Sequence, residues 1–519
     1  MTTNTKPRAV IIGGGATGCG VGRDLVLRNF DVTLIEFGDL GSGTSSRFHG
    51  MLQSGARYVV SDPEFAAECM GERLNIANLA PDVVEQTGGV FTSLPSDPTT
   101  FADKFFAQCK IVGIPSEELD PEQFMRDEPK ISRKVQRAFS VPDATIHSWR
   151  LVNLLADDIR HYGGQVLTRH QVTCIDIKNG KAKGVSVSGT DGTCYFPADI
   201  IVNAAGPWSG RVARLVGEET DLELGKGSIL VFSHRMTTRA VNRCRPPTSH
   251  DIIVPTGTIS LFGTTSEVVA SPDTTHVRPE EVQELLVNAE ELIPNARSYR
   301  GFRVWAGVRP LYRPPGWNSD KPLSRKHSII EHAENGIEGF FTICGGSLTT
   351  HRLMAEDLGN KICASIGLNM PCLSATKPLM RKETPPDWRP AQNYYQVEKA
   401  QRQSAPLCEC ESVLRDDVAG MIKEHGIMHL HDLRRRLRLG FGPCQGTFCG
   451  ASAAALIASE VPEYDALSDL GAFWTERLKG SCHTAWGSQA KQALLSDLVY
   501  RQTLGIRLTE DILPKDKRR

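Results

Sequence analysis

A glycine-rich turn close to the N-terminus constrains the fold of this chain more than any other feature. Residues 8–36, RAVIIGGGATGCGVGRDLVLRNFDVTLIE, predict a buried strand, a glycine turn, a helix and a second strand. Gly13, Gly15 and Gly18 form G-x-G-x-x-G, which allows a tight turn, close approach to a pyrophosphate, and close packing of helix on strand. We therefore expect a parallel α/β unit that binds a dinucleotide, with the pyrophosphate at the helix N-terminus.

An acidic residue ends the second strand of this unit. A carboxylate at Glu36 can accept hydrogen bonds from both ribose hydroxyls, and it repels a 2′-phosphate. The alternative is a glycine turn with a purely structural role. Strand, turn, helix, second strand and acid all occur within about thirty residues, as the dinucleotide fingerprint requires. The fingerprint does not distinguish FAD from NAD.

Two later segments favour FAD. Residues 199–210, DIIVNAAGPWSG, predict a strand that ends in small residues, where a ligand can approach the backbone. Residues 339–363 predict a strand, a double-glycine turn and a helix whose N-terminus can face a polar or anionic ligand edge. Segments this far apart would enclose a flavin dinucleotide along its length, whereas either segment alone could be an ordinary strand–helix junction.

The length and charge of the chain set its broad class. With 519 residues it exceeds what one hydrophobic core supports, so we expect two or more domains. A net charge of −1 argues against broad electrostatic binding of nucleic acid or acidic membranes. No run of roughly eighteen apolar residues predicts a membrane-spanning helix. The first residues also lack the pattern of a secretory signal, so we expect a cytoplasmic protein.

Four of the 14 cysteines stand apart because they occur in two close pairs. Cys408 and Cys410 form C-x-C, and Cys444 and Cys449 form C-x4-C. Four thiolates complete the ligand set of a [2Fe–2S] cluster. Zinc also binds four cysteines, but usually in C-x2-4-C pairs, and disulfides are uncommon in the cytoplasm. We interpret the set as cluster ligands because redox chemistry is predicted in the same chain, with zinc as the alternative.

Several segments together resemble one enzyme family. A T-S-S loop and a G-x-R-Y motif lie within residues 39–73, and GGSLTTHRLMAE occupies residues 345–356. In these stretches the chain resembles the FAD-dependent glycerol-3-phosphate dehydrogenases. With the paired cysteines, it is most similar to the large catalytic subunits of the anaerobic enzymes. The cysteine region resembles the bacterioferritin-associated-ferredoxin type of [2Fe–2S] domain. Further matching stretches are residues 141–151, 242–266, 306–312 and 323–327.

The resemblance implies a fold of the α/β class. An FAD-binding Rossmann-type domain, similar to those of glutathione reductase and D-amino-acid oxidase, would be joined to a mixed β-sheet substrate domain and a small helical C-terminal [2Fe–2S] domain. The oxidoreductase domain would span residues 1–375, with substrate-side segments at roughly 90–150 and 216–330. The remaining boundaries would be a proline-rich, charged linker at 376–406, the [2Fe–2S] domain at 407–465, and a helical tail at 466–519.

The resemblance also implies an activity. The enzyme would oxidise sn-glycerol 3-phosphate to dihydroxyacetone phosphate by hydride transfer to the flavin. Electrons would then pass through an iron–sulfur relay to partner subunits, including a membrane-anchored iron–sulfur subunit, and on to quinone. Such a protein would be cytoplasmic and associated peripherally with the inner face of the cytoplasmic membrane.

Residue types at family positions suggest a substrate site. Arg57, Arg309 and Arg325 would line the substrate or flavin face, where guanidinium groups bind a phosphate bidentately. Tyr58 could bond the substrate oxygen, and His49 lies in the loop expected beneath the isoalloxazine. Surface charge or ion pairing is the alternative for each arginine, and a structural hydrogen bond is the alternative for His49.

The expected FAD contacts come from the glycine turn, from Glu36, from the T-S-S loop and from the ends of the later strands. They are Gly13, Gly14, Gly15, Thr17, Gly18, Glu36, Thr44, Ser45, Ser46, His49, Gly50, Val172, Ala205, Gly206, Gly345, Gly346, Ser347, Leu348 and Thr349.

The chain departs from the family at four positions. Ser347 stands where the family commonly has lysine, and His351 stands where it has tyrosine. His147 begins a segment that is often D-P-x-R-L in the family, and Ile229 stands where some relatives have histidine. Loss of a lysine removes a positive charge from the expected phosphate site. The same chemistry on another polyol phosphate, 2-hydroxy acid or amino-acid-derived compound is therefore the alternative.

Two other classes of function also fit parts of the sequence. One is a flavin oxidase that reduces oxygen directly and carries a structural zinc module. The other is an electron-transfer subunit without catalytic activity. Basic residues before Cys444 could offset cluster charge or dock a partner, with a solvated helix face as the alternative; they are Arg434, Arg435, Arg436 and Arg438.

Overall fold

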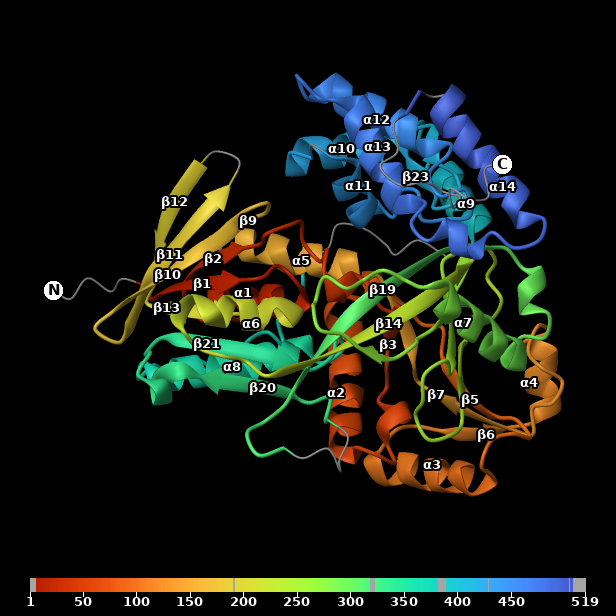
Figure 1. Cartoon of the computed structure of the whole chain (residues 1–519), viewed down its shortest axis with the longest axis horizontal. Helices are drawn as coiled ribbons and strands as arrows, with labels where there is room; N and C mark the ends of the chain where they lie inside the picture. The colour runs from red at the N-terminus through yellow and green to blue at the C-terminus, as the bar shows by residue number, and fades with distance from the viewer. Residues whose placement is uncertain are drawn as a thin grey trace.

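The computed structural model describes residues 6–189, 192–317, 323–380, 389–427, 429–503 and 505–506. Three regions pack on one another (Figure 1). They are an α/β domain, a domain built around a nine-stranded sheet, and a mostly helical C-terminal region that covers one side of both. We call the last region, residues 405–506, the cysteine module.

The α/β domain is centred on a six-stranded sheet of order β20-β21-β13-β1-β2-β9. The strands from β21 to β9 pair in parallel, and β20 pairs antiparallel with β21. The strands are β1 (Arg8–Ile12), β2 (Asp31–Ile35), β9 (Gln165–Leu167), β13 (Ile200–Asn203), β20 (His327–Glu331) and β21 (Phe340–Gly345).

Both faces of this sheet are covered, which explains the continuous apolar run of β1. Successive side chains of a strand point to opposite faces. Ala9 and Ile11 pack into the core with three helices, whereas Val10 and Ile12 pack against a small antiparallel sheet of order β10-β11-β12. The covering elements are α1 (Ala16–Leu27), α5 (Ser148–His161), α8 (His351–Ser365), β10 (Gln171–Lys178), β11 (Lys181–Gly189) and β12 (Gly192–Pro197).

The second domain is formed by two separate stretches of chain. Its sheet follows the order β18-β14-β17-β16-β15-β5-β7-β6, and β19 pairs antiparallel with the long strand β14. The strands are β5 (Gly89–Ser93), β6 (Glu117–Leu119), β7 (Arg137–Val141), β14 (Leu222–Phe232), β15 (Ala240–Arg243), β16 (Ile252–Thr256), β17 (Ile259–Gly263), β18 (Glu267–Val268) and β19 (Gly301–Tyr312).

Helices cover this sheet, and a small sheet links it to the α/β domain. Helix α7 packs over one apolar cluster, and α2 and α3 pack over another. The helices are α2 (Pro63–Leu79), α3 (Thr99–Val112), α4 (Pro121–Asp127) and α7 (Pro279–Leu292). The short helix α6 (Ser209–Ala213) instead packs on the α/β domain. The small sheet has the order β3-β8-β4, from β3 (Met51–Leu52), β4 (Val84–Glu85) and β8 (Ala144–Ile146).

The cysteine module has its own hydrophobic core. Trp474 and Tyr500 stack with ring centroids 4.5 Å apart, in the same cluster as Cys408 and Cys449. The segment predicted as a helical tail therefore shares one core with the cysteines, and its basic end lies outside the described residues. The elements are β22 (Pro406–Cys408), β23 (Val413–Leu414), α10 (Arg415–His425), α11 (Leu430–Leu437), α12 (Cys449–Glu460), α13 (Ala466–Arg477) and α14 (Gln489–Leu498). Helix α9 (Pro390–Lys399) precedes the module, within the stretch predicted as a linker.

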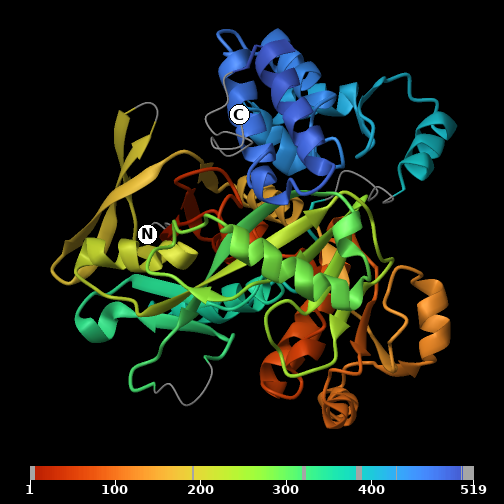
Figure 2. The same ribbon diagram turned by 45° about the vertical axis from the view of Figure 1, so that its right-hand side comes forward.

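The arginine run of α11 faces the rest of the chain. Arg435 pairs with Asp39, and Arg436 Nη1 lies 3.6 Å from Asp157 Oδ2. A contact of the opposite polarity joins Arg169 Nη2 of the α/β domain to a carboxylate oxygen of Asp432 in α11, over 3.0 Å. The alternative of a solvated helix face is therefore wrong. These charges attach the module to the α/β domain, in the orientation seen from a second side in Figure 2.

Candidate functional site

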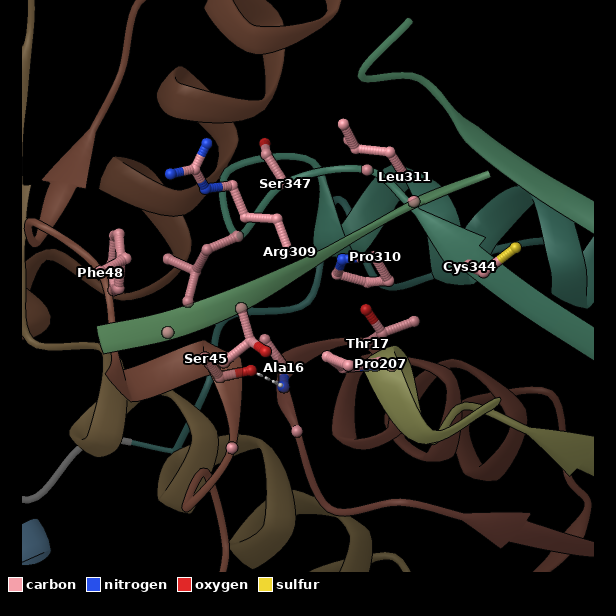
Figure 3. A pocket seen from close by; sticks show the side chains of 18 of the residues that line it. Ala16, Thr17, Ser45, Phe48, Pro207, Arg309, Pro310, Leu311, Cys344 and Ser347 are labelled. Atoms are coloured by element: carbon pink, nitrogen blue, oxygen red, sulfur yellow. Dashed lines mark hydrogen bonds between the residues drawn. The ribbon is translucent and has the colours of Figure 1, made fainter. Parts of the chain in front are cut away.

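A large cavity lies between the α/β domain and the nine-stranded sheet. Its volume is about 1860 Å³, which exceeds the roughly 300–1,000 Å³ of a typical small-molecule pocket. Thr17 and Ser45 lie on one side, and Arg309 and Ser347 project on the other (Figure 3). The cavity therefore has room for an extended cofactor and a small substrate together.

The glycine turn after β1 forms one end of the cavity. Gly13 has φ +117°, and a Cβ there would lie 2.6 Å from the Ala204 carbonyl oxygen. At Gly18 a Cβ would lie 1.9 Å from the Gly13 carbonyl oxygen. A side chain at Gly13 would push the turn away from the end of β13, and a side chain at Gly18 would push α1 away from the turn. The turn thus has the close packing that the dinucleotide fingerprint requires.

Glu36 lines the cavity beside this turn, at the end of β2. Its carboxylate accepts hydrogen bonds from the backbone N–H of Gly14 (2.6 Å) and of Gly38 (2.7 Å). Burial raises the pKa of Glu36 although these two donors lower it. The carboxylate therefore also holds the shape of the turn, a function that the sequence did not suggest.

The T-S-S loop lies against the N-terminus of α1. Ser45 Oγ accepts a hydrogen bond from the backbone N–H of Ala16 (2.9 Å), and Thr44 Oγ1 donates to the Val308 carbonyl (2.6 Å). Both residues line the cavity. Thr44 and Ser45 thereby join the glycine turn to β19 of the other domain. The N–H groups at this helix end other than that of Ala16 could bind an anion.

The opposite wall is the turn between β21 and α8. Gly345 and Gly346 have φ +76° and +71°, where a residue with a Cβ is strained. Other predicted cofactor residues also face the cavity, and these are Gly13, Gly15, Thr17, Val172, Ala205, Gly206, Gly345, Gly346, Ser347, Leu348 and Thr349.

Four predicted cofactor residues support the cavity without lining it. Gly14 packs on Glu36, and Gly18 packs on the Gly13 carbonyl. Gly50 accepts a hydrogen bond from the Ile146 N–H (2.8 Å). Ser46 lines a second, smaller cavity beside the cysteine module.

Three guanidinium groups line the large cavity away from the glycine turn. Arg57 lies in η2 (Ala56–Tyr58), Arg309 in β19, and Arg325 in the segment before β20, so distant parts of the chain contribute them. Arg57 Nη2 donates to Asp251 Oδ2 (2.9 Å), and Arg309 Nη2 donates to Thr264 Oγ1 (3.0 Å). Burial, and then the charges of Arg325 and Arg57, lower the pKa of Arg309 to about 10. This end of the cavity is therefore strongly electropositive.

His49 and Tyr58 line the same end. Burial, followed by the charges of Arg57, Arg309 and Arg325, lowers the pKa of His49 to about 3. The Met51 N–H donates to His49 Nδ1 (3.2 Å), so the proton of the neutral ring resides on Nε2. Among the described residues, the Arg325 guanidinium makes no hydrogen bond, and its Cζ lies 5.6 Å from the Tyr58 ring centroid.

The departures from the family pattern fall mostly outside the cavity. His351 is buried at the start of α8, where its Nδ1 donates to the Leu348 carbonyl (2.9 Å). Ile229 is buried in β14 opposite Trp305. His147 Nδ1 accepts a hydrogen bond from Arg438 of the cysteine module (3.0 Å). Of these departures, Ser347 alone lines the cavity.

Sequence reasoning missed three residues at the electropositive end. Asp251 holds Arg57 by an ion pair, and Thr264 holds Arg309. Lys326 lines the cavity and pairs with Glu64 (2.7 Å). Asp251 and Thr264 lie in the matching stretch 242–266, but no local pattern marks them, because their partners are distant in sequence.

The four paired cysteines come together within the cysteine module. The Sγ atoms of Cys408 and Cys410 are 3.8 Å apart. Cys410 also contacts Cys444, and Cys408 contacts Cys449. The contacts from Cys410 and then Cys449 lower the pKa of Cys408, and the contact from Cys410 lowers the pKa of Cys444, whereas the same contacts raise the pKa of Cys410 and of Cys449. All four thiols are free.

Backbone N–H groups surround these sulfurs. Glu411 and Gly440 donate to Cys408, and Gly446 and Phe448 donate to Cys444. A Cβ at Gly442 would lie 2.4 Å from Cys410 Sγ, so the backbone approaches the sulfur closely. Within the part of the chain that the structure describes, no three His, Cys, Asp or Glu side chains are arranged around one metal position.

Among the described residues, no helix has the length and apolar character needed to cross a membrane.

Comparison with known proteins places the chain among flavin enzymes. The model of the family "DAO: FAD dependent oxidoreductase" matches residues 8–359. The chain is similar to the A-subunit of the anaerobic glycerol-3-phosphate dehydrogenase of Escherichia coli, with 36% identity over 523 residues that cover 96% of each chain. It is 33% identical to the A1-subunit of the Haloferax volcanii enzyme of the same name over 532 residues, which cover 96% of this chain and 91% of that protein.

Solved structures show the same fold. A glycerol-3-phosphate dehydrogenase from Bacillus halodurans, complexed with FAD, aligns with a TM-score of 0.66 and 20% identity, covering 92% of this chain and 96% of that one. Glycine oxidase from Bacillus cereus aligns with a TM-score of 0.57 and 19% identity, over 73% of this chain and 99% of that one. The fold class predicted from the sequence is therefore confirmed.

Proposed function

Because this chain belongs to the FAD dependent oxidoreductase family, and within it to the A-subunits of the anaerobic glycerol-3-phosphate dehydrogenases, we propose that it oxidises sn-glycerol 3-phosphate to dihydroxyacetone phosphate. One observation carries the proposal. A single cavity joins the glycine turn at one end to the guanidinium groups of Arg57, Arg309 and Arg325 at the other. That arrangement suits a dinucleotide and a phosphorylated substrate bound together.

The residues at the glycine turn fit FAD. The absence of side chains at Gly13 and Gly15 leaves the backbone open to a pyrophosphate, beside the N-terminus of α1. Glu36 lies where a ribose would bind, and the turn before α8 closes the other wall. When FAD is bound, it supplies the acceptor for the hydride of the substrate carbinol. The protein binds, orients and polarises the substrate beside it.

The three arginines would bind the substrate phosphate. Arg325 makes no hydrogen bond to another described residue, so its donors are available to a ligand. Arg57 is fixed by a hydrogen bond to Asp251, and Arg309 by a hydrogen bond to Thr264. These bonds orient the remaining N–H donors of both arginines. A dianion at this point would offset the repulsion among the guanidinium groups. Charge-assisted bonds of this kind are about twice as strong as neutral ones.

His49 would hold the substrate hydroxyl. Its Nδ1 is occupied by the Met51 N–H, and its Nε2 carries the proton of the neutral ring. The ring is therefore a hydrogen-bond donor to an oxygen in the cavity. Tyr58 lines the same end and would provide a second polar contact. Neutral His49 adds no charge to a site that already contains three guanidinium groups.

The cysteine module would carry electrons away from the flavin. Cys408, Cys410, Cys444 and Cys449 would supply the four thiolates of a [2Fe–2S] cluster, and backbone N–H groups that donate to Cys408 and Cys444 favour the ionised form of these two thiols. Such a cluster would accept one electron at a time. Three contacts, Cys408–Cys410, Cys408–Cys449 and Cys410–Cys444, link the four sulfurs and support this proposal.

Partner subunits would receive these electrons. Phe448 lies beside Cys449 and is 81% exposed, so a partner could contact it next to the cysteines. The similar proteins are named as one subunit of an enzyme, which indicates an assembly of several chains. We expect partners that include a membrane-anchored iron–sulfur subunit, quinone as the final acceptor, and peripheral association with the cytoplasmic face of the membrane through them.

Anaerobic reduction of the flavin tests the function. The purified chain, loaded with FAD, should lose its flavin absorbance within seconds of adding glycerol 3-phosphate, and iron and acid-labile sulfide should both be present. Ser347 lines the cavity where relatives often have lysine, so a panel containing other polyol phosphates, 2-hydroxy acids and amino acids belongs in the assay. Bleaching by an unphosphorylated compound alone would contradict the proposed substrate.

A further inference from the structure

A second cavity lies at the junction between the cysteine module and the rest of the chain. Its volume is about 240 Å³. One wall comes from Ser46, Trp149 and Trp305 of the two N-terminal domains, and the other from His431 and Phe441 of the module. Ser42 and Arg47 line this cavity and also the large one, so the loop that contains them separates the two.

Positive charge dominates the lining of this junction cavity. Glu476 is the carboxylate among its lining residues. The cationic side chains are Arg47, Arg303, Arg434, Arg435, Arg477 and Lys479. Arg435 is compensated by Asp39 and by Asp432. Arg303 shares Glu476 with its neighbours, with an Nη2–Oε1 distance of 3.0 Å. The remaining guanidinium charge therefore exceeds what the lining carboxylate can balance.

The buried donors of this cavity lack partners. Arg434 is 6% exposed, yet its guanidinium makes no hydrogen bond to any described residue, and its Cζ lies 5.6 Å from the Trp149 ring centroid. The Nε atoms of Arg303, Arg434 and Arg477 and the Nη1 atom of Arg477 are buried without an acceptor, and His431 Nδ1 is buried without a partner. An unpaired donor buried in this way costs free energy, and a buried charge costs more.

The cysteine cluster cannot supply all of the missing negative charge. Cys449 is close enough to affect the pKa of Arg477, so thiolates can balance that residue. The charge that most stabilises the ionised forms of Arg434 and Arg303 is that of Glu476, and no cysteine is among the leading contributions. Arg303 of β19 and Arg434 of α11 therefore depend on the same carboxylate, and only Arg303 makes a direct ion pair with it among the described residues.

We propose that the junction cavity binds a small tetrahedral oxyanion of the phosphate class, which bridges Arg303 of the nine-stranded domain to Arg434 of the cysteine module. Guanidinium forks match such an anion geometrically and remain charged at neutral pH. The anion would accept hydrogen bonds from the orphaned Nε–H groups and would hold the module against the other domains. Free inorganic phosphate and the phosphoryl group of a small ester are two sources of the same chemistry.

Calorimetric titration of the FAD-loaded, full-length chain with inorganic phosphate tests this site. Bound FAD fills the position at the N-terminus of α1 where a free phosphate could otherwise bind, so we expect no phosphate to bind there. We expect two phosphate sites, one in the large cavity and one at the junction. Arg434→Gln should weaken the junction site at least tenfold, since a hydrogen bond to a charged group contributes about 1.5–3 kcal/mol. Arg415→Gln, an exposed arginine on α10, is the matched control and should leave both sites unchanged.

Two further variants separate this site from the substrate site. Arg309→Gln should remove the phosphate site of the large cavity and leave the junction site intact. Glu476→Gln removes the competing carboxylate, so it should tighten phosphate binding at the junction severalfold. Loss of the junction site in Arg434→Gln together with tightening in Glu476→Gln supports the proposal, whatever the result for Arg309. Wild-type and Arg434→Gln proteins with the same phosphate stoichiometry and affinity would overturn it.

The two sources of the anion are distinguished by a parallel titration. Methyl phosphate in place of inorganic phosphate reports whether the cavity admits an ester. If only inorganic phosphate binds, and Arg434→Gln weakens this binding, the site is specific for the free anion. If inorganic phosphate and methyl phosphate both bind, the site accepts a phosphoryl group in general. Bound anion should also slow hydrogen exchange in α11 and α13, an effect that Arg434→Gln should abolish.

Discussion

Arg438 Nη1 of the cysteine module donates a hydrogen bond to Nδ1 of His147, at the N-terminus of α5, over 3.0 Å. Arginine has no acceptor, so His147 is the acceptor and keeps its proton on Nε2. Arg438 also bonds Glu411 Oε2 (2.6 Å), next to the cysteine pair. His147, which we expected to differ from the family pattern, thus contributes to attachment of the module and does not line the large cavity.

This junction gives the first prediction. Arg438→Gln should lower the apparent stability of the module by about 1–2 kcal/mol, as expected for loss of a charge-assisted hydrogen bond. Thermal unfolding should show it, and the KM for glycerol 3-phosphate should stay unchanged because neither residue lines the substrate cavity. A double-mutant cycle with His147→Ala should give a coupling energy, whereas additive effects would contradict a direct bond.

The substrate arginines give the second prediction. Arg309→Lys keeps the charge but loses the fork that bonds Thr264 and the Thr265 carbonyl. The KM for glycerol 3-phosphate should rise by about tenfold to a hundredfold, with FAD content unchanged. Steady-state dye reduction measures this, and Arg415→Lys is the control. An unchanged KM would remove Arg309 from the phosphate site.

The third prediction concerns pH. Burial and three guanidinium groups lower the pKa of His49 to about 3, so His49 should not titrate between pH 5 and 8. The shape of the kcat/KM profile in this range should be the same for the wild type and for His49→Gln, although the variant should be slower. An ionisation near pH 6 that disappears in His49→Gln would show that His49 acts as a base.

Buried His351 gives the fourth prediction, on acid stability. Burial lowers its pKa to about 4 in the folded chain, against 6.5 when unfolded. Between these values the unfolded state binds more protons, so stability falls as the pH drops through this window. From pH 7 to 4.5, His351 should account for about 2 kcal/mol of destabilisation. His351→Gln should flatten the fall in thermal midpoint, whereas exposed His161→Gln should not.

The cysteine set gives the fifth prediction. Cys408→Ser should abolish most of the bound iron and acid-labile sulfide, while FAD content and substrate-driven bleaching of the flavin are retained. Transfer of electrons to an external one-electron acceptor should slow. Cys174→Ser, at an exposed cysteine of β10, is the control. Stoichiometric zinc without iron in the wild-type chain would instead support a structural module.

Local patterns account for much of the fold. The strand, turn and helix at Gly13, Gly15 and Gly18 depend on neighbouring residues, so spacing alone predicts them. The resemblance of matching stretches predicts the fold class and names Arg57, Arg309 and Arg325, which the structure brings to one cavity. In contrast, Asp251 and Thr264 carry no local signature, since their importance lies in contacts with residues far along the chain.

The sequence by itself determined the glycine turn, the paired cysteines and the α/β class, because each follows from short-range sterics, periodicity and ligand spacing. Only the tertiary structure decided that the arginines of α11 face inward, that His147 contacts Arg438, and that Arg303 and Arg434 meet in a buried cavity. Those relationships join segments more than a hundred residues apart, so they depend on how whole domains pack, which no local pattern encodes.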